Sequence, residues 1–368
     1  MVKFVCEWEV LMNYLILTCK FGMGHMSVSN AIKDELVNFD NDINVEIVDV
    51  IDYMLPNYNK PIYNAFNFLV GRFPKVYNFF YNNFNSSCNT PAAFSSVEKI
   101  KKLIDIYNAD IIISTMPVCS QFVAKYKKKT KSKIPMYTFI TDITVSPEWI
   151  NDYTDKYFVG DDRVKKELMR RGISDNEINV TGIPVKQCFK VDNKSNVNEG
   201  HIYKILMMGG GLGLFSDEYE KIIDSFDKMN RVEVTVITGK NKKAYSELSS
   251  KYKNTNILGY VDNVDEYMRN ADLIISKPGG ITLFESIYSS TPLYVINPLL
   301  AQEINNAKFI EDKNIGRVIW NEKEINVIED ILNVLGKNRK CNTMKNEIVK
   351  IKNKLLKINL GKECSLEV

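Results

Sequence analysis

Residues 276–285, S-K-P-G-G-I-T-L-F-E, carry the strongest chemical pattern in this sequence. They follow an apolar run at 271–275 that predicts a buried parallel strand, and they lead into a predicted helix. The pair Gly279-Gly280 lets a ligand approach the backbone, and free N–H groups at a helix N-terminus bind phosphate. Thr282 adds a hydroxyl, and Glu285, one turn later, can accept hydrogen bonds from ribose. The segment suggests a nucleotide-sugar site; an ordinary strand-turn-helix crossover with a capping threonine is the alternative.

Each half of the chain has a Gly-rich turn after a predicted strand, at residues 22–25 and 209–213. A dinucleotide fingerprint needs a third glycine, where this chain has Ser27 and Leu214. Neither turn ends in the Lys-Ser/Thr pair of a phosphate-binding P-loop. These turns therefore disfavour NAD and predict a different ligand.

His25 closes the first Gly-rich turn and begins a predicted helix. The positive end of the helix dipole disfavours an imidazolium, so the ring is expected to be neutral and able to act as a general base. A turn residue hydrogen-bonded to backbone is the plain alternative. Asp142 is the second catalytic candidate, and it could orient His25, bind an acceptor or cap a turn.

Composition describes a globular chain of 368 residues, with 45% hydrophobic and 25% charged residues and a net charge of +3. This length predicts two domains, and so small a charge does not by itself indicate nucleic acid. Seven cysteines without a C-x-x-C pair and only two histidines argue against a disulfide framework or a metal centre. The sequence has no transmembrane run and no evident signal peptide, and residues 1–11 are left out of the predicted fold.

Short apolar runs alternate with helical patterns, which predicts parallel sheets in an α/β fold with two Rossmann-like domains facing each other across a cleft. The polar stretch 190–200 predicts the linker. The domains are expected at 12–190 and 201–345, with 346–368 forming a helix that could pack back on the first. The predicted strands are 13–18, 45–50, 110–114, 136–140, 156–159, 179–181, 204–208, 232–237, 256–258, 273–276 and 293–296.

An aromatic window extends from Tyr53 to Phe94 and holds twelve Tyr and Phe but no Asp or Glu. Such composition suits the boundary between lipid headgroups and acyl chains. A second segment, 125–133, has six lysines, each worth ~1 kcal/mol near an anionic membrane. The plain alternatives are a helical hairpin in the core and a solvated loop. The acceptor and membrane candidates are Gly22, Gly24, Phe66, Phe73, Phe79, Phe80, Lys127, Lys128 and Lys129.

Five motifs in order resemble the diacylglycerol glycosyltransferases, which include the monogalactosyldiacylglycerol synthases and are related to the lipid II-forming transferase of glycosyltransferase family 28. They are G-M-G-H at 22–25, T-D with a later W-I at 141–150, V-T-G-I-P-V at 180–185, S-K-P-G-G-I-T at 276–282, and Q-E with a later N-A at 302–307. Ser146 departs from the family pattern, because it replaces a histidine that usually follows Thr-Asp, and Lys20 and Met23 replace small residues common in the first turn. These departures weaken the acceptor prediction more than the donor prediction.

The resemblance implies a B-type glycosyltransferase fold, inversion at the sugar and no cofactor or tightly bound metal. It implies a UDP-sugar held by Glu285 at the ribose, by Thr282, Gly279, Gly280, Gly211 and Gly213 at the diphosphate, and by Gln302 and Glu303 at the sugar. We therefore expect a peripheral enzyme of the cytoplasmic membrane face that moves glucose or galactose from UDP-glucose or UDP-galactose to diacylglycerol or a glycolipid. Two alternatives stay open: a polyprenyl-linked or other glycan acceptor, and a UDP-sugar epimerase. A nucleic-acid partner is not expected.

Overall fold

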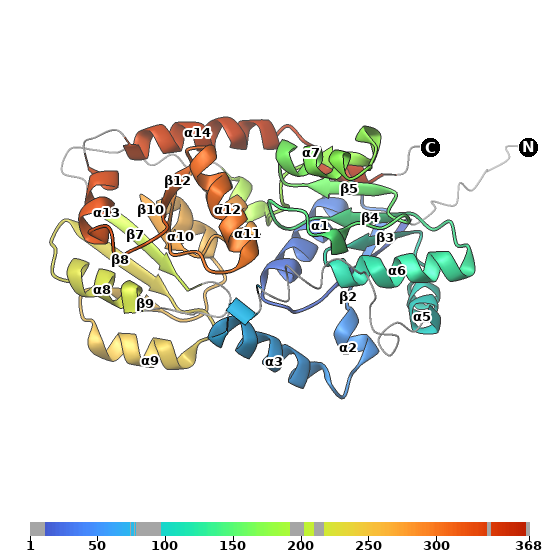
Figure 1. The fold of residues 1–368 in the computed structure, drawn as a ribbon, viewed down its shortest axis with the longest axis horizontal. Helices are drawn as coiled ribbons and strands as arrows, with labels where there is room; N and C mark the ends of the chain where they lie inside the picture. Colours follow the sequence, from blue (N-terminus) through green and yellow to red (C-terminus); the bar gives the residue numbers. More distant parts are fainter. Residues whose placement is uncertain are drawn as a thin grey trace, which may run out of the picture.

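The computed structural model describes residues 12–73, 75–76, 78, 97–191, 202–209, 217–336 and 340–365. Two parallel sheets of six strands each form two lobes, as Figure 1 shows. Their strand orders are β2-β1-β3-β4-β5-β6 and β12-β11-β10-β7-β8-β9. This arrangement is the predicted pair of Rossmann-like domains.

The first sheet consists of β1 Met12–Thr18, β2 Ile43–Asp49, β3 Ile111–Ser114, β4 Met136–Phe139, β5 Lys156–Val159 and β6 Ile178–Val180. The second consists of β7 Tyr203–Met208, β8 Val232–Ile237, β9 Asn256–Leu258, β10 Leu273–Ser276, β11 Leu293–Ile296 and β12 Gly316–Ile319. Strand β12 was not predicted. Its four residues include an arginine and lie at the sheet edge, so the sequence gives only a weak apolar signal there.

Helices connect the strands on both faces of each sheet. In the first lobe they are α1 Gly24–Phe39, α2 Val50–Met54, α3 Asn59–Arg72, α5 Val97–Tyr107, α6 Pro117–Thr130 and α7 Asp162–Arg170. In the second they are α8 Asp217–Phe226, α9 Lys242–Lys251, α10 Val264–Asn270, α11 Gly280–Tyr288, α12 Ala301–Asp312 and α13 Val327–Leu335. Two C-terminal helices follow, α14 Lys340–Leu355 and α15 Leu360–Cys364.

Strand β1 shows how the sequence builds the layers. Because side chains alternate across a strand, Tyr14 and Ile16 face one core and Leu15 and Leu17 face another. The first of these cores continues into the second lobe, where it includes Ile274 and Phe284. The two lobes therefore share buried apolar contacts beside the cleft.

The motif at 180–185 packs where the lobes meet. Gly182 has φ +78°, and a Cβ there would lie 3.0 Å from Phe284 and from Leu355. Only glycine adopts this left-handed backbone readily and also leaves that space free. The motif thus serves the junction between the lobes.

The C-terminal helices cross from the second lobe to the first. Figure 1 shows α14 in red along the upper edge, reaching toward α7. Its Lys354 pairs with Asp162 at 3.2 Å, and Tyr14 of β1 donates a hydrogen bond to the carbonyl oxygen of Cys364 in α15. This end of the chain holds the lobes together. Within the described ranges, no helix is both long enough and apolar enough to span a bilayer.

Candidate active site

A cavity of about 410 Å³ lies between the two lobes. It is lined from the first lobe by the turn after β1 and the loop after β4, and from the second by the ends of β7, β8 and β10. Both strand orders reverse near these ends, β1 being flanked by β2 and β3, and β7 by β10 and β8. Parallel sheets bind ligands at such switch points, and this volume suits a small molecule.

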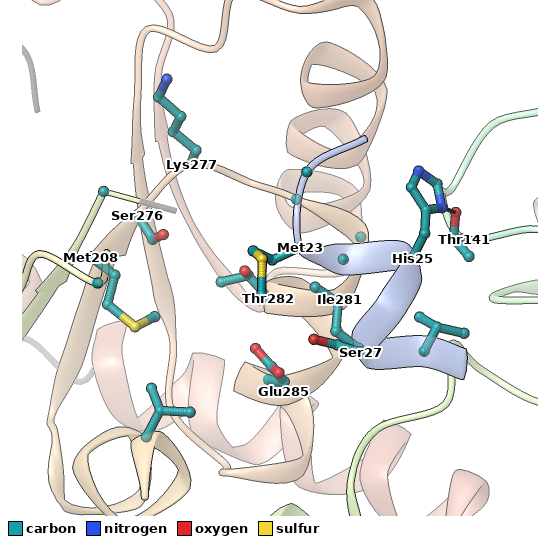
Figure 2. A pocket seen from close by; sticks show the side chains of 18 of the residues that line it. Met23, His25, Ser27, Thr141, Met208, Ser276, Lys277, Ile281, Thr282 and Glu285 are labelled. Atoms are coloured by element: carbon teal, nitrogen blue, oxygen red, sulfur yellow. Dashed lines mark hydrogen bonds between the residues drawn. The ribbon is translucent and has the colours of Figure 1, made fainter. Parts of the chain in front are cut away.

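His25 is the second residue of α1 and is held by two groups of its own lobe. Its Nδ1 lies 3.0 Å from the carbonyl oxygen of Thr115 and 3.1 Å from Oγ1 of Thr141, which Figure 2 shows beside the ring. A carbonyl oxygen can only accept, so Nδ1 carries the proton and Nε2 keeps its lone pair. Burial lowers the pKa of His25, and the charge of Asp142 opposes that shift. The ring is therefore a neutral base at the cavity wall.

Asp142 follows β4 and takes part in a contact between the lobes. Its Oδ1 accepts a hydrogen bond of 3.3 Å from Nδ2 of Asn306, a buried residue of α12. Asn306 also accepts from the N–H of Ile143 at 3.0 Å and donates to the carbonyl oxygen of Pro278 at 2.9 Å. Burial raises the pKa of Asp142, and His25 and Asn306 act in the opposite direction. The ring of His25 is oriented by threonines, and Asp142 adds charge beside it.

The N-terminus of α11 meets the first lobe at Gly280. A Cβ on residue 280 would lie 1.9 Å from the carbonyl oxygen of Thr141, so this glycine is required for the close approach of the lobes. Gly279 is the N-cap residue of α11 and provides no side-chain hydrogen bond. The backbone amides of the first turn of α11 are therefore open to a ligand. Thr282 and Glu285 project from the same side of α11 in Figure 2.

A second helix N-terminus faces the first. Helix α1 begins at Gly24, and its N-cap Met23 provides no side-chain hydrogen bond. A Cβ on Gly24 would lie 3.4 Å from Cγ2 of Ile281, which places the two helix starts in contact range. Two uncapped N-termini beside one cavity create a positive potential that suits a diphosphate.

Glu285 is a cavity-lining carboxyl with an unusual proton affinity. Burial raises its pKa to about 7, with Asp265 adding to the shift and Lys186 opposing it. Lys186 comes from the first lobe and lines the same cavity. Hydrogen bonds donated by ligand hydroxyls would stabilise the ionised form of this carboxyl.

Gln302 and Glu303 line the cavity from the first turn of α12 and differ in what they offer. Oε1 of Gln302 is buried and finds no hydrogen-bond partner within the described part of the chain. Glu303 is already engaged, because its Oε2 accepts the N–H groups of Leu299 and Leu300 at 3.2 and 3.1 Å. Gln302 is thus available to a ligand, and Glu303 stabilises the helix start beside it.

Sequence reasoning missed several cavity residues. Oγ of Ser276, at the end of β10, is buried, lines the cavity and lacks a partner among the described residues. Tyr260 and Val261 follow β9, and Lys240 after β8 lies over the Tyr260 ring at 5.7 Å. Their position at carboxyl ends of strands is a signal that could have found them.

The predicted acceptor residues have different surroundings. Gly22, with φ +76°, and Gly24 line the cavity. Phe66 packs its ring against Phe21 of the Gly-rich turn at 4.8 Å, and Phe73 lies exposed after α3. Four predicted residues lie outside the described ranges: Phe79, Phe80, Gly211 and Gly213.

The prediction that Lys127 contacts a membrane is wrong. Lys127, Lys128 and Lys129 belong to the last turn of α6, and the Lys127 side chain is 6% exposed. Its Nζ donates to Asp155 at 2.7 Å and to the carbonyl oxygen of Tyr153 at 3.0 Å. Lys128 and Lys129 are exposed, but α6 starts at the carboxyl end of β3 and carries them about 20 Å toward the opposite edge of the sheet.

Ser146, the departure from the family motif, is buried and does not line the cavity. Its hydroxyl donates to Oε1 of Glu148 at 3.2 Å. It therefore plays a packing role in the loop after β4.

Comparisons with known proteins agree with this architecture. Residues 25–185 match the family model "Monogalactosyldiacylglycerol (MGDG) synthase", and residues 205–358 match "Glycosyltransferase family 28 C-terminal domain". A processive diacylglycerol beta-glucosyltransferase of Bacillus pumilus (strain SAFR-032) is 31% identical over 358 residues, covering 90% of this chain and 88% of that protein. The Bacillus subtilis (strain 168) protein of the same name is 28% identical over 91% of this chain and 90% of its own.

Solved structures share the fold at low sequence identity. MurG of Acinetobacter baumannii superposes with a TM-score of 0.57 at 13% identity, covering 94% of this chain and all of that one. The glycotransferase of kitacinnamycin gives 0.60 at 11% identity, covering 95% of both chains. At these identities the likeness concerns the fold alone.

Proposed function

Because this chain belongs to the diacylglycerol glycosyltransferase family within glycosyltransferase family 28, we propose that it transfers glucose from UDP-glucose to diacylglycerol. One observation carries the proposal. A cavity between the lobes is lined by His25 from one side and by the N-terminus of α11 with Glu285 from the other. The proposed general base and the proposed anion site thus line the same cavity.

The donor is proposed to lie against the second lobe. Glu285 would accept hydrogen bonds from the ribose hydroxyls, and the amides at the starts of α11 and α1 would bind the diphosphate. The unpartnered Oε1 of Gln302 would accept from a sugar hydroxyl. Relatives named beta-glucosyltransferases favour glucose over galactose.

The proposed chemistry is one in-line displacement. The acceptor hydroxyl attacks the anomeric carbon while its proton passes to Nε2 of His25, and the bond from that carbon to the diphosphate oxygen breaks. The charge on departing UDP is stabilised by the two helix N-termini, in the manner of an oxyanion site. UDP-glucose is an α-glycoside, so inversion gives the β product that the relatives' names describe.

The acceptor is proposed to reach His25 from a membrane surface along α3. This helix lies along the lower edge of the molecule in Figure 1, and Val70 on it lines the cavity. The helix exposes Phe68, and Phe73, directly after the helix, is exposed too. The sequence from 53 to 94 also holds Lys60, Arg72 and Lys75 and no acidic residue. Exposed aromatic rings with cations suit a bilayer interface, and we propose peripheral binding at the cytoplasmic face.

The test is incubation of the purified protein with labelled UDP-glucose or UDP-galactose and mixed vesicles containing diacylglycerol. The expected product is β-glucosyldiacylglycerol, formed also in the presence of EDTA. Transfer only to a polyprenyl-linked or soluble glycan would replace the acceptor in the proposal. Interconversion of free UDP-sugars without lipid, followed by NMR, would replace transfer with epimerisation.

A further inference from the structure

Helix α12 caps part of its own start, because Glu303 in its first turn accepts the N–H of the N-cap residue. Its N-cap is Leu300, which provides no side-chain hydrogen bond to the first turn. Glu303 takes the N–H groups of Leu299 and Leu300. The N–H groups of the first helical residues, beginning with Ala301, need acceptors from outside the helix. A helix start that carries a ligand-binding side chain needs these groups satisfied to be rigid.

The acceptor for the N–H of Ala301 comes from the other lobe. Oδ1 of Asn78 accepts the N–H of Ala301 at 2.9 Å, and Nδ2 of the same amide donates to the carbonyl oxygen of Leu299 at 2.7 Å. The amide therefore satisfies a donor and an acceptor on either side of Leu300. Asparagine has both groups on a short side chain, whereas serine and aspartate lack the amide donor.

Asn78 lies on the same segment as the aromatic helix. Upstream, α3 is fixed to the catalytic lobe, because Tyr63 donates to Oδ1 of Asp49 at 2.7 Å and accepts the N–H of Lys20 at 3.1 Å. Phe66 packs on Phe21, which itself lines the cavity. The segment thus connects the turn before His25 with the start of α12.

This segment and the loop that it contacts both expose large apolar side chains. Phe68 is 65% exposed, Val76 near Asn78 is 42% exposed, and Leu299 in the second lobe is 50% exposed. Val76, two residues before Asn78, and Leu299, whose carbonyl oxygen accepts from Asn78, place exposed apolar groups of both lobes near the Asn78 contact. A lipid surface that binds them would hold the segment against the start of α12.

We propose that Asn78 is a positioning residue that caps α12 from the opposite lobe and so couples lipid binding by the α3 segment to the sugar side of the donor site. Gln302 directly follows the capped residue and lines the cavity, and its buried Oε1 has no hydrogen-bond partner among the described residues. Its position depends on the first turn of α12. The coupling to lipid rests on the function proposed above, whereas the cap itself does not.

Hydrogen exchange of the Ala301 amide tests the cap directly. We expect Asn78→Ala to speed exchange at Ala301 roughly tenfold, the usual effect of losing a helix cap. Asn78→Asp keeps an acceptor at a helix N-terminus and should give a smaller change. Asn64→Ala is the matched control, because it removes an exposed amide of α3 that makes no side-chain hydrogen bond to the described residues. Equal exchange in Asn78→Ala, Asn64→Ala and wild-type protein would overturn the proposal.

Kinetics and vesicles test the coupling. Asn78→Ala should raise the KM for UDP-glucose roughly tenfold and leave the Kd for UDP, which lacks the sugar, within about twofold of wild type. Vesicles of anionic lipid should slow exchange at Ala301 in wild type but not in Asn78→Ala. A vesicle effect of equal size in both proteins would refute the coupling. If wild-type protein transfers no glucose, the proposed function fails while the exchange data still decide whether Asn78 caps α12.

Discussion

The carbonyl oxygen of Thr141 occupies the space that a side chain on Gly280 would need, since a Cβ there would lie 1.9 Å from it. Thr141 also contacts the ring of His25 through Oγ1, and Gly280 begins the helix proposed to hold the diphosphate. Gly280, which was predicted to let a ligand approach the backbone, thus also allows close contact with the opposite lobe. This backbone contact brings the proposed proton acceptor and the proposed diphosphate site together.

Gly280→Ala should therefore separate the lobes at the catalytic contact. We expect kcat to fall on the order of 100-fold, because a displacement near 1 Å is enough to misalign reacting groups. Gly259→Ala is the matched control, because an added Cβ there would meet nothing within 4 Å and Gly259 is not among the residues that line the cavity. Steady-state kinetics decide the point, and equal activity in the two variants would contradict the steric argument.

His25→Ala should lower kcat by about 10²- to 10⁴-fold and leave UDP binding nearly unchanged, since the base acts on the acceptor hydroxyl. Because burial lowers the pKa of His25, wild-type kcat at saturating UDP-glucose should be level at neutral pH and fall only below about pH 6.5. Asp142→Asn removes a charge that raises this pKa, so the acidic limb should move to lower pH. If the acidic limb of Asp142→Asn moves to higher pH, or if the His25→Ala variant is fully active, His25 is not the base.

Glu285 should make donor binding depend on pH. Burial raises its pKa to about 7, so the carboxyl is largely protonated at pH 6 and largely ionised at pH 8. If the ionised form binds the ribose hydroxyls, affinity for UDP-glucose should weaken up to about tenfold from pH 8 to pH 6. Calorimetry on wild type and on Glu285→Gln, which cannot titrate, measures this effect. Equal pH dependence in both proteins would exclude Glu285.

Lys127 should matter for stability and not for lipid binding. Lys127→Met removes the partner of the half-exposed Asp155, and we expect unfolding free energy to fall by ~1–3 kcal/mol in urea titrations. Lys128→Met, at an exposed neighbouring position, should change it by less than ~0.5 kcal/mol. Sedimentation with anionic vesicles should be unchanged in Lys127→Met under native conditions.

Phe68 and Phe73 should carry much of the proposed membrane affinity. Their rings are 65% and 46% exposed and lie 5.7 Å apart, so both can enter an interface together. Replacing both by serine should weaken vesicle binding at least about tenfold, since each buried ring contributes ~1.5–3 kcal/mol. Binding of UDP to the double variant should match wild type. Unchanged sedimentation would show that another surface meets the lipid.

The sequence by itself determined the local elements and the family. Apolar runs of strand length predicted eleven of the twelve strands that the structure describes, because backbone preference and burial act over a few residues. The resemblance carried by five short motifs is confirmed by the family models and by relatives matching most of the chain.

Only the tertiary structure decided which side chains share a space. Lys127 belongs to an exposed-looking lysine run, yet helix phase turns it inward to Asp155. Asn306 and Asn78 are distant in sequence from the residues to which they hydrogen-bond, and no local pattern predicts a hydrogen bond between the lobes. Contacts of this kind depend on how two separately folded sheets pack, which is set by surfaces that sequence spacing does not encode.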